Sequence, residues 1–217
     1  MALLVSCGKP SESVGNRTVF KMNLYAGLST LDPAYASDQS ATWMCAQIFN
    51  GLLEFDTVLG LQPSLCRTWE ITDSGRTYTF HLRDDVWFHK SPLLGPDSTR
   101  QMVASDVEYS FTRICEPAVA AKGFWIFNGK VEGVETFREG RSAQISGFQA
   151  PNDSTFVIRM QKPFAPFPNL LAMAYASVVP KEVVAFYGKD FRSHPIGTGP
   201  FRFKSWNENV SLILLKN

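Results

Sequence analysis

The most constraining feature of this 217-residue sequence is the stretch TYTFHLRDDVWFH at residues 77–89. Tyr78, Phe80 and Leu82 alternate with polar side chains, and a period of two residues is typical of a β-strand that buries one face. His81 is therefore expected on the opposite, polar face. Because such a strand needs neighbouring strands and an apolar layer over its buried face, the stretch predicts a sheet packed against a core.

Turn residues on both sides of this strand predict how the sheet continues. The preceding TDSG contains residues that tolerate positive φ, and it predicts a hairpin whose first strand includes Trp69. After the strand, Arg83 paired with Asp84 or Asp85 is expected to fix a tight turn. We expect residues 86–88 to rejoin the sheet beyond that turn.

A helical stripe of apolar residues precedes the sheet. It predicts a helix over residues 40–51, with Ser37, Asp38 or Ser40 as the cap at its start and Gly51 as its left-handed stop.

A second helix is predicted over residues 105–116, because Ser105 and Glu108 match an S-x-x-E capping box and Pro117 follows. The prolines of residues 161–169 are expected to exclude regular structure. The other predicted elements are strands at 18–25 and 155–160, short helices at 170–175 and 181–188, and a Gly-rich loop with a hairpin at 195–216. Since strands and helices do not alternate regularly, the sequence predicts an α+β (mixed α/β) fold with at least two lobes.

Charge and hydropathy exclude several classes of protein. The chain has 21 basic and 20 acidic residues and a formal net charge of +1, so it has no overall field to attract nucleic acid. We therefore expect no nucleic-acid partner. Its apolar runs are far shorter than the roughly 20 residues that a membrane-spanning helix requires.

The N-terminal LLVSCG resembles the end of a bacterial lipoprotein signal, in which a cysteine receives the lipid. This resemblance implies a lipid on Cys7, a signal remnant and tether over residues 1–17, and a domain outside the cytoplasm. The alternative is that these residues form a ragged, unstructured start.

Candidate catalytic and metal-binding residues do not group in the sequence. Cys45, Cys66 and Cys115 are widely spaced and fit neither a disulfide framework nor a zinc site, so we expect them in the core. The loop GTGP at 197–200 lacks the Lys-Ser/Thr of a phosphate loop. We therefore expect no enzyme activity, no metal site and no cofactor.

Several stretches, in order, resemble the family 5 extracellular solute-binding proteins, the receptors of peptide and nickel ABC importers. The resemblance covers residues 18–217, and the stretches that carry it are LDPAYASDQSATWMCAQIFNGLLEFD, PSLCRTWEITDSGRTYTFHLRDDVWFH, ASDVEYSFTR, VVPKEVV and HPIGTGPFRFKSW.

The resemblance implies a periplasmic binding protein type II-like fold of which only a part is present. Residues 18–50 and 161–217 would form part of lobe one, residues 51–160 would form lobe two, and lobe three would be absent. It also implies an extended oligopeptide ligand, permease subunits of an ABC transporter as partners, and a periplasmic or cell-surface location on a lipid anchor.

By carry-over from the family, Ser37, Asp38 and Gln39 would pair with the peptide through their backbone, and Phe124 and Trp125 would line the mouth of the cleft. For the two aromatic residues, ordinary packing in lobe two is an equal alternative. The same scaffold also carries nickel-chelate, haem or oligosaccharide cargo, so these ligands remain open. An interaction module or an unrecognised hydrolase is the alternative from another class.

Overall fold

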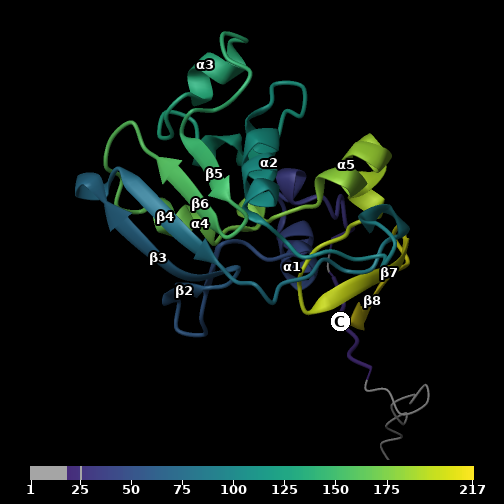
Figure 1. Ribbon diagram of the computed structural model, residues 1–217. Helices are drawn as coiled ribbons and strands as arrows, with labels where there is room; N and C mark the ends of the chain where they lie inside the picture. The colour runs from purple at the N-terminus through teal and green to yellow at the C-terminus, as the bar shows by residue number, and fades with distance from the viewer. Residues whose placement is uncertain (1–18, 25) are drawn as a thin grey trace, which may run out of the picture.

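The computed structural model describes residues 19–24 and 26–217 (Figure 1). With η for a 3-10 helix, the elements along the chain are η1 (Pro33–Tyr35), α1 (Gln39–Ile48), β1 (Leu53–Phe55), β2 (Leu61–Pro63), β3 (Cys66–Thr72), η2 (Asp73–Gly75), β4 (Thr77–Leu82), η3 (Pro92–Leu94), α2 (Ala104–Cys115), η4 (Lys122–Ile126), α3 (Val134–Arg138), β5 (Phe148–Asn152), β6 (Thr155–Arg159), α4 (Phe167–Leu171), η5 (Ala174–Ala176), α5 (Lys181–Tyr187), η6 (Gly188–Ser193), β7 (Phe201–Asn207) and β8 (Ser211–Lys216).

A four-stranded antiparallel sheet in the order β3-β4-β6-β5 forms one side of the molecule (Figure 1). Its centre is the predicted strand, because Tyr78, Phe80 and Leu82 of β4 are buried while His81 is exposed. The predicted hairpin is also confirmed. Asp73, Ser74 and Gly75 of η2 all have positive φ between β3 and β4.

The buried face of this sheet packs on aromatic side chains from the helices. Phe111 of α2 lies 5.7 Å and 5.6 Å, between ring centroids, from Phe148 of β5 and Phe156 of β6, and 4.9 Å from Phe127 after η4. Aromatic pairs at these spacings contribute about 0.5–1.5 kcal/mol each beyond the area they bury. The sheet, α2 and η4 therefore share one aromatic core.

The other side of the molecule holds α1, α5 and the two-stranded β7–β8 hairpin (Figure 1). In the loop before β7, the Gly199 N–H donates to the Ile48 carbonyl at the end of α1, at 2.8 Å. A Cβ atom at Gly199 would lie 2.6 Å from the Ile48 carbonyl carbon, so only glycine fits at this position. The predicted Gly-rich loop is thus a packing element that seats the hairpin on α1.

The strand predicted over residues 18–25 is wrong for its described part. Residues 19–24 have no regular structure, and Val19, Phe20 and Met22 are exposed. Alternating polarity is not enough to make a strand, because the backbone also needs a partner to pair with. Among the described residues no strand pairs with this segment. Cys7 and the rest of residues 1–17 lie outside the described part of the chain.

Several predicted helix ends differ from the observed ones. Helix α1 ends at Ile48 rather than at Gly51, whose backbone forms an isolated bridge with Ser177. Helix α2 begins one residue before Ser105, so the Asp106 carboxylate, not Glu108, accepts the Val103 N–H, at 3.0 Å.

Two other expectations about regular structure are also wrong. Helix α4 starts inside the proline-rich residues 161–169, because Pro168 is tolerated in a first helical turn. The helix predicted over 170–175 is instead the end of α4 and the short η5.

Residues 86–88 do not rejoin the sheet; only Trp87 forms an isolated bridge, with Gln101. In contrast, α5 ends at Gly188 with φ of 54°, as predicted. Within residues 19–24 and 26–217, none of the helices combines the length and the apolar character that a membrane crossing requires.

Candidate ligand-binding surface

The loop that leads into α1 is fixed by a buried ion pair. Asp32 and Arg113 of α2 form two hydrogen bonds of 2.6 Å and 3.0 Å, and their side chains are only 3% and 9% exposed. Asp32 also accepts the Ala34 N–H at 3.1 Å. Burial alone would lower the pKa of Arg113, but the bonds to Asp32 outweigh it, and the pKa is raised. The Leu-Asp-Pro motif thus anchors the loop to α2.

The start of α1 contains the three residues predicted to pair with a peptide. Asp38, one of the three predicted candidates, is the N-cap. Its carboxylate accepts hydrogen bonds from the Ala41 N–H at 2.8 Å and from the Ser29 hydroxyl at 2.7 Å. Partial burial would raise the pKa of Asp38, but these hydrogen bonds outweigh it, and the pKa is lowered. Asp38 is therefore an ionised cap whose oxygens already have partners.

Ser37 and Gln39, on either side of the cap, are exposed. Within the described part of the chain, neither the Ser37 carbonyl nor the Gln39 side-chain amide makes a hydrogen bond. These polar groups are therefore free to bind another molecule.

Phe124 and Trp125 lie together in η4 but have different surroundings. Phe124 is half-buried beneath the Arg138 guanidinium, whose carbon lies 3.9 Å from the ring centroid. Trp125 is 45% exposed, and Lys130 Nζ donates to its carbonyl at 2.8 Å. Phe124 is thus held by packing, whereas Trp125 presents its ring to the surface.

Tyr175 of η5, which sequence reasoning missed, joins these two parts. Element η5 contacts η1, η4 and α1. A Cβ atom at Gly123 of η4 would lie 2.6 Å from the Tyr175 Cβ, so glycine is what allows η4 to approach so closely. Burial and the nearby charge of Asp38 raise the pKa of Tyr175. An isolated tyrosine in LLAMAYAS gives no sequence signal of this position.

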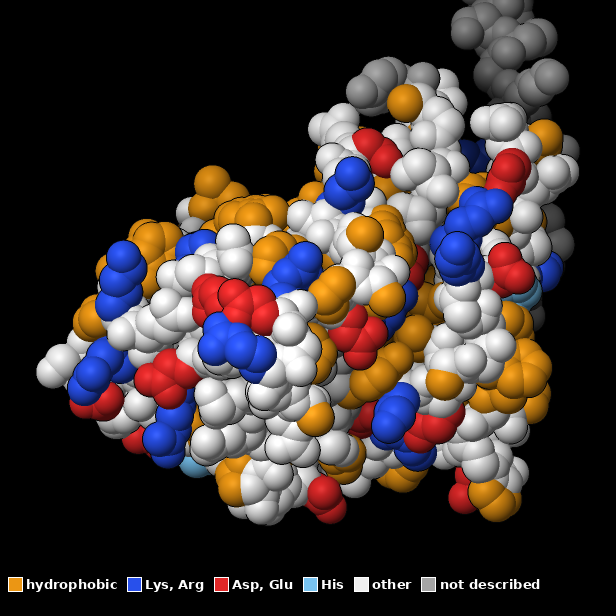
Figure 2. Space-filling model, turned by 90° about the horizontal axis from the view of Figure 1, so that it is seen from above, with side chains coloured by type: hydrophobic (Ala, Val, Ile, Leu, Met, Phe, Trp, Pro, Cys, Tyr) orange, Lys and Arg blue, Asp and Glu red, His pale blue; other side chains and the backbone are white. Residues whose placement is uncertain are grey.

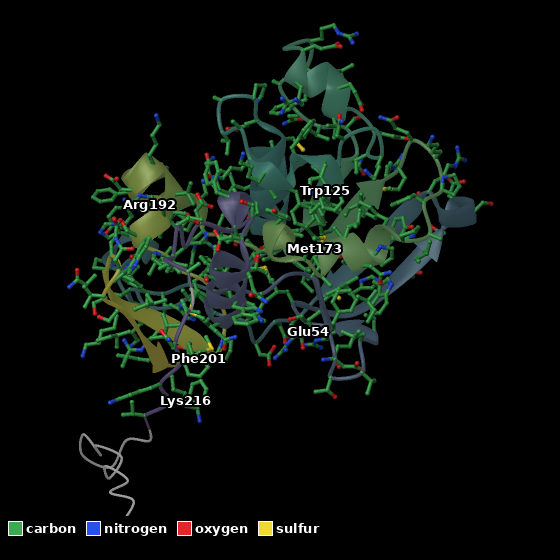
Figure 3. All side chains as sticks on the ribbon, turned by 180° about the vertical axis from the view of Figure 1, so that it is seen from behind. Glu54, Trp125, Met173, Arg192, Phe201 and Lys216 are labelled. Carbon is green, nitrogen blue, oxygen red and sulfur yellow. The ribbon has the colours of Figure 1, made fainter. Side chains whose placement is uncertain are left out.

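We define the η1–η5 surface as Ser37, Asp38, Gln39, Trp125, Met173 and Tyr175. In Figure 3 the labelled Trp125 and Met173 lie on the same side of the molecule, one above the other. The surface combines exposed backbone, a tryptophan ring and a phenol that makes no hydrogen bond to another described residue. Such a surface can bind an extended chain by hydrogen bonding and apolar contact.

His89 holds the loop before β7 from the other side. Its Nε2 lies 2.8 Å from the Gly199 carbonyl, and its Nδ1 lies 3.4 Å from the Gly197 N–H. Since a carbonyl only accepts and an N–H only donates, both bonds require the neutral ring with its proton on Nε2. Burial and the charge of Arg202 lower the pKa of His89, and together they outweigh the bond to the Gly199 carbonyl, which would raise it.

The cysteines predicted for the core are indeed buried. Burial raises the pKa of the thiol of Cys66 to about 11 and of Cys115 to about 12, and it also raises the pKa of Cys45. All three are therefore protonated thiols at neutral pH. In the described residues no three His, Cys, Asp or Glu side chains are grouped to hold a metal ion.

Comparison with known proteins defines the class to which this fold belongs. A family model described as "Bacterial extracellular solute-binding proteins, family 5 Middle" matches residues 60–217. The chain therefore belongs to the family 5 extracellular solute-binding proteins, and this confirms the resemblance drawn from the sequence. These are binding proteins, not enzymes.

Among individual relatives, the chain is 26% identical over 207 residues to the glutathione-binding protein GsiB of Escherichia coli O6:K15:H31 (strain 536 / UPEC), covering 95% of this chain and 35% of that protein. An oligopeptide-binding protein, OppAIV of Borrelia burgdorferi, superposes with a TM-score of 0.82 at 28% identity, over 93% of this chain and 39% of the other. DppA of Helicobacter pylori, solved with the peptide STSA, superposes with a TM-score of 0.71 at 29% identity. The match covers 88% of this chain and 38% of DppA. The chain spans little more than a third of the length of each.

Proposed function

We propose that this chain is part of the substrate-binding component of an ABC importer, and that its ligand is an oligopeptide held in an extended form. Two of its relatives carry peptide or glutathione binding in their names, and a third was solved with a peptide bound. Glutathione is itself a small peptide, so the three names agree on the chemistry of the ligand. Permease subunits of the importer are the proposed protein partners, and the periplasm is the proposed location.

The binding site that we propose is the η1–η5 surface. The observation that carries this proposal is the Ser37 carbonyl, which has no hydrogen-bond partner among the described residues, beside the exposed Gln39. The Asp38 cap and the Asp32–Arg113 ion pair hold this loop in place. Main-chain hydrogen bonds from an extended peptide give affinity without requiring one side-chain sequence. Trp125 and Tyr175 would then contact the peptide's side chains.

The proposed division into lobes follows the sequence. Residues 18–50 and 161–217 would belong to lobe one and residues 51–160 to lobe two. The four-stranded sheet lies wholly within residues 51–160, which supports this division. A lipid on Cys7 would anchor the protein to the membrane.

Calorimetry of this chain with trialanine and with glutathione tests the proposal. We expect saturable binding of at least one of the two peptides. Tyr175→Ala should weaken that binding by about tenfold, the loss of roughly 1.4 kcal/mol of contact. Phe186→Ala is the matched control, since Phe186 is 68% exposed on α5, outside the η1–η5 surface, and should leave binding unchanged. Equal losses in both variants, or no binding of either peptide, would contradict the proposal.

A further inference from the structure

A second concave region lies between α2 and α5, outside the η1–η5 surface. It is a groove of about 620 Å³ whose walls come from α2, the start of α5 and the loop around residues 143–145. Figure 2, which shows the molecule from above, has a hollow between the left and right parts of the surface. A volume of this size is within the range of small-molecule sites.

Three of the charged groups that line the groove are bonded to one another. Arg100 bonds to the Asp106 carboxylate at 2.7 Å and to Glu182 at 2.8 Å. The bonds to Asp106 and Glu182 raise the pKa of Arg100 despite its partial burial. This triad is therefore a structural clamp between α2 and α5, and its two carboxylates exceed its one guanidinium by one negative charge.

Two further charged groups in the groove have no such partners. Glu108 is half-buried on α2, and Lys181 is exposed at the start of α5. In the described part of the chain, neither side chain forms an ion pair or a hydrogen bond. Lys181 Nζ only lies 6.0 Å from the centroid of the Tyr109 ring. Burial raises the pKa of Glu108.

The groove wall also includes apolar surface. Val103 and Tyr109, both half-buried, line it. A half-buried carboxylate has lost part of its hydration. An ammonium group can replace the lost water by donating charge-assisted hydrogen bonds to the carboxylate. A carboxylate on the same ligand could bind Lys181, which also lines the groove.

We propose that the groove between α2 and α5 binds a small zwitterion, an aliphatic α-amino acid. Glu108 binds its ammonium group, Lys181 binds its carboxylate, and its side chain lies against Val103 and Tyr109. This site is separate from the η1–η5 surface and does not depend on the proposed peptide function.

The test uses L-leucine, leucine amide and N-acetyl-leucine, followed by amide chemical shifts of the isotope-labelled chain. Leucine carries both charges, whereas each analogue keeps only one. We expect saturable shifts at Glu108, Thr112, Gln144 and Lys181 with leucine, and affinities at least about tenfold lower for both analogues. Shifts confined to the η1–η5 surface would overturn this inference while leaving the proposed peptide site intact.

Two variants test which side chain binds which charged group of leucine. Glu108→Gln should lower the affinity for leucine to that for N-acetyl-leucine, and Lys181→Met should lower it to that for leucine amide. Glu208→Gln is the control, because Glu208 pairs with Arg192, outside the groove, at the turn of the β7–β8 hairpin. Neither Glu108 nor Lys181 is bonded to the Arg100 triad, so both variants should fold, and circular dichroism checks this. Equal binding of leucine and its two analogues, or no effect of either substitution, would overturn the inference.

Discussion

Replacing Arg113 by methionine should be among the most damaging single changes outside the aromatic core. The Asp32 side chain, only 3% exposed, would stay buried without its counter-charge. Removing one partner of a buried ion pair costs about 3–5 kcal/mol, because the desolvated charge that remains has no compensation. For a chain of this size the urea m-value is about 2–3 kcal/mol per M, so the unfolding midpoint should fall by roughly 1–2 M.

Urea unfolding followed by circular dichroism measures this midpoint, and two further variants isolate the cause. Arg83→Met is the matched control, since Arg83 and Asp85 form an exposed pair with side chains 44% and 64% accessible. Such pairs contribute about 0–1 kcal/mol. Asp32→Asn combined with Arg113→Met removes both charges but keeps an acceptor for the Ala34 N–H, and it should recover about 2 kcal/mol relative to Arg113→Met alone.

The reasoning would be refuted if Arg113→Met and Arg83→Met lost the same stability. It would equally fail if the double variant were less stable than Arg113→Met, because burial of an unpaired charge would then not be the cause. A large loss with recovery in the double variant would show that the ion pair holds the loop before α1 in place.

Three other changes test local parts of the structure. Because the pKa of His89 is lowered in the folded chain, the unfolded chain binds a proton there more readily. The free energy of unfolding should therefore fall as the pH drops below about 6.5. His89→Gln should reduce this pH dependence, measured by urea titrations at several pH values. Gly199→Ala should lower stability by about 1–3 kcal/mol in thermal unfolding, because its Cβ would overlap the end of α1. Asp38→Ala should cost about 1 kcal/mol in urea unfolding, the typical value of an N-cap, whereas Ser37→Ala should cost nothing measurable.

The sequence predicted the elements whose signals are local. The hairpin around Asp73–Gly75 was predictable because its turn residues and the period-two pattern of β4 both lie within a few residues of it. Asp38 was identifiable as a cap for the same reason. The Arg83–Asp85 pair is likewise a contact between near neighbours, with two bonds of 2.9 Å.

Features that depend on distant partners were not predictable. Asp32 and Arg113 are 81 residues apart, and neither the Leu-Asp-Pro loop nor α2 indicates the ion pair by its pattern. Tyr175 joins the candidate surface only because Gly123 leaves room for it. The strand expected over residues 18–25 failed for a related reason, since pairing depends on another strand and not on its own alternation of polarity.

The claim that this chain holds its ligand by the peptide's main chain can be tested with N-methylated peptides. Calorimetry would compare trialanine with the same peptide methylated on its central amide nitrogen, and with triserine as the side-chain control. We predict that methylation weakens binding by about tenfold, because it removes one main-chain hydrogen bond and adds a methyl group where that bond would form. Triserine should bind within about threefold of trialanine. If methylation had no effect while the change of side chains abolished binding, recognition would rest on side chains, and the account given for Ser37–Gln39 would be wrong.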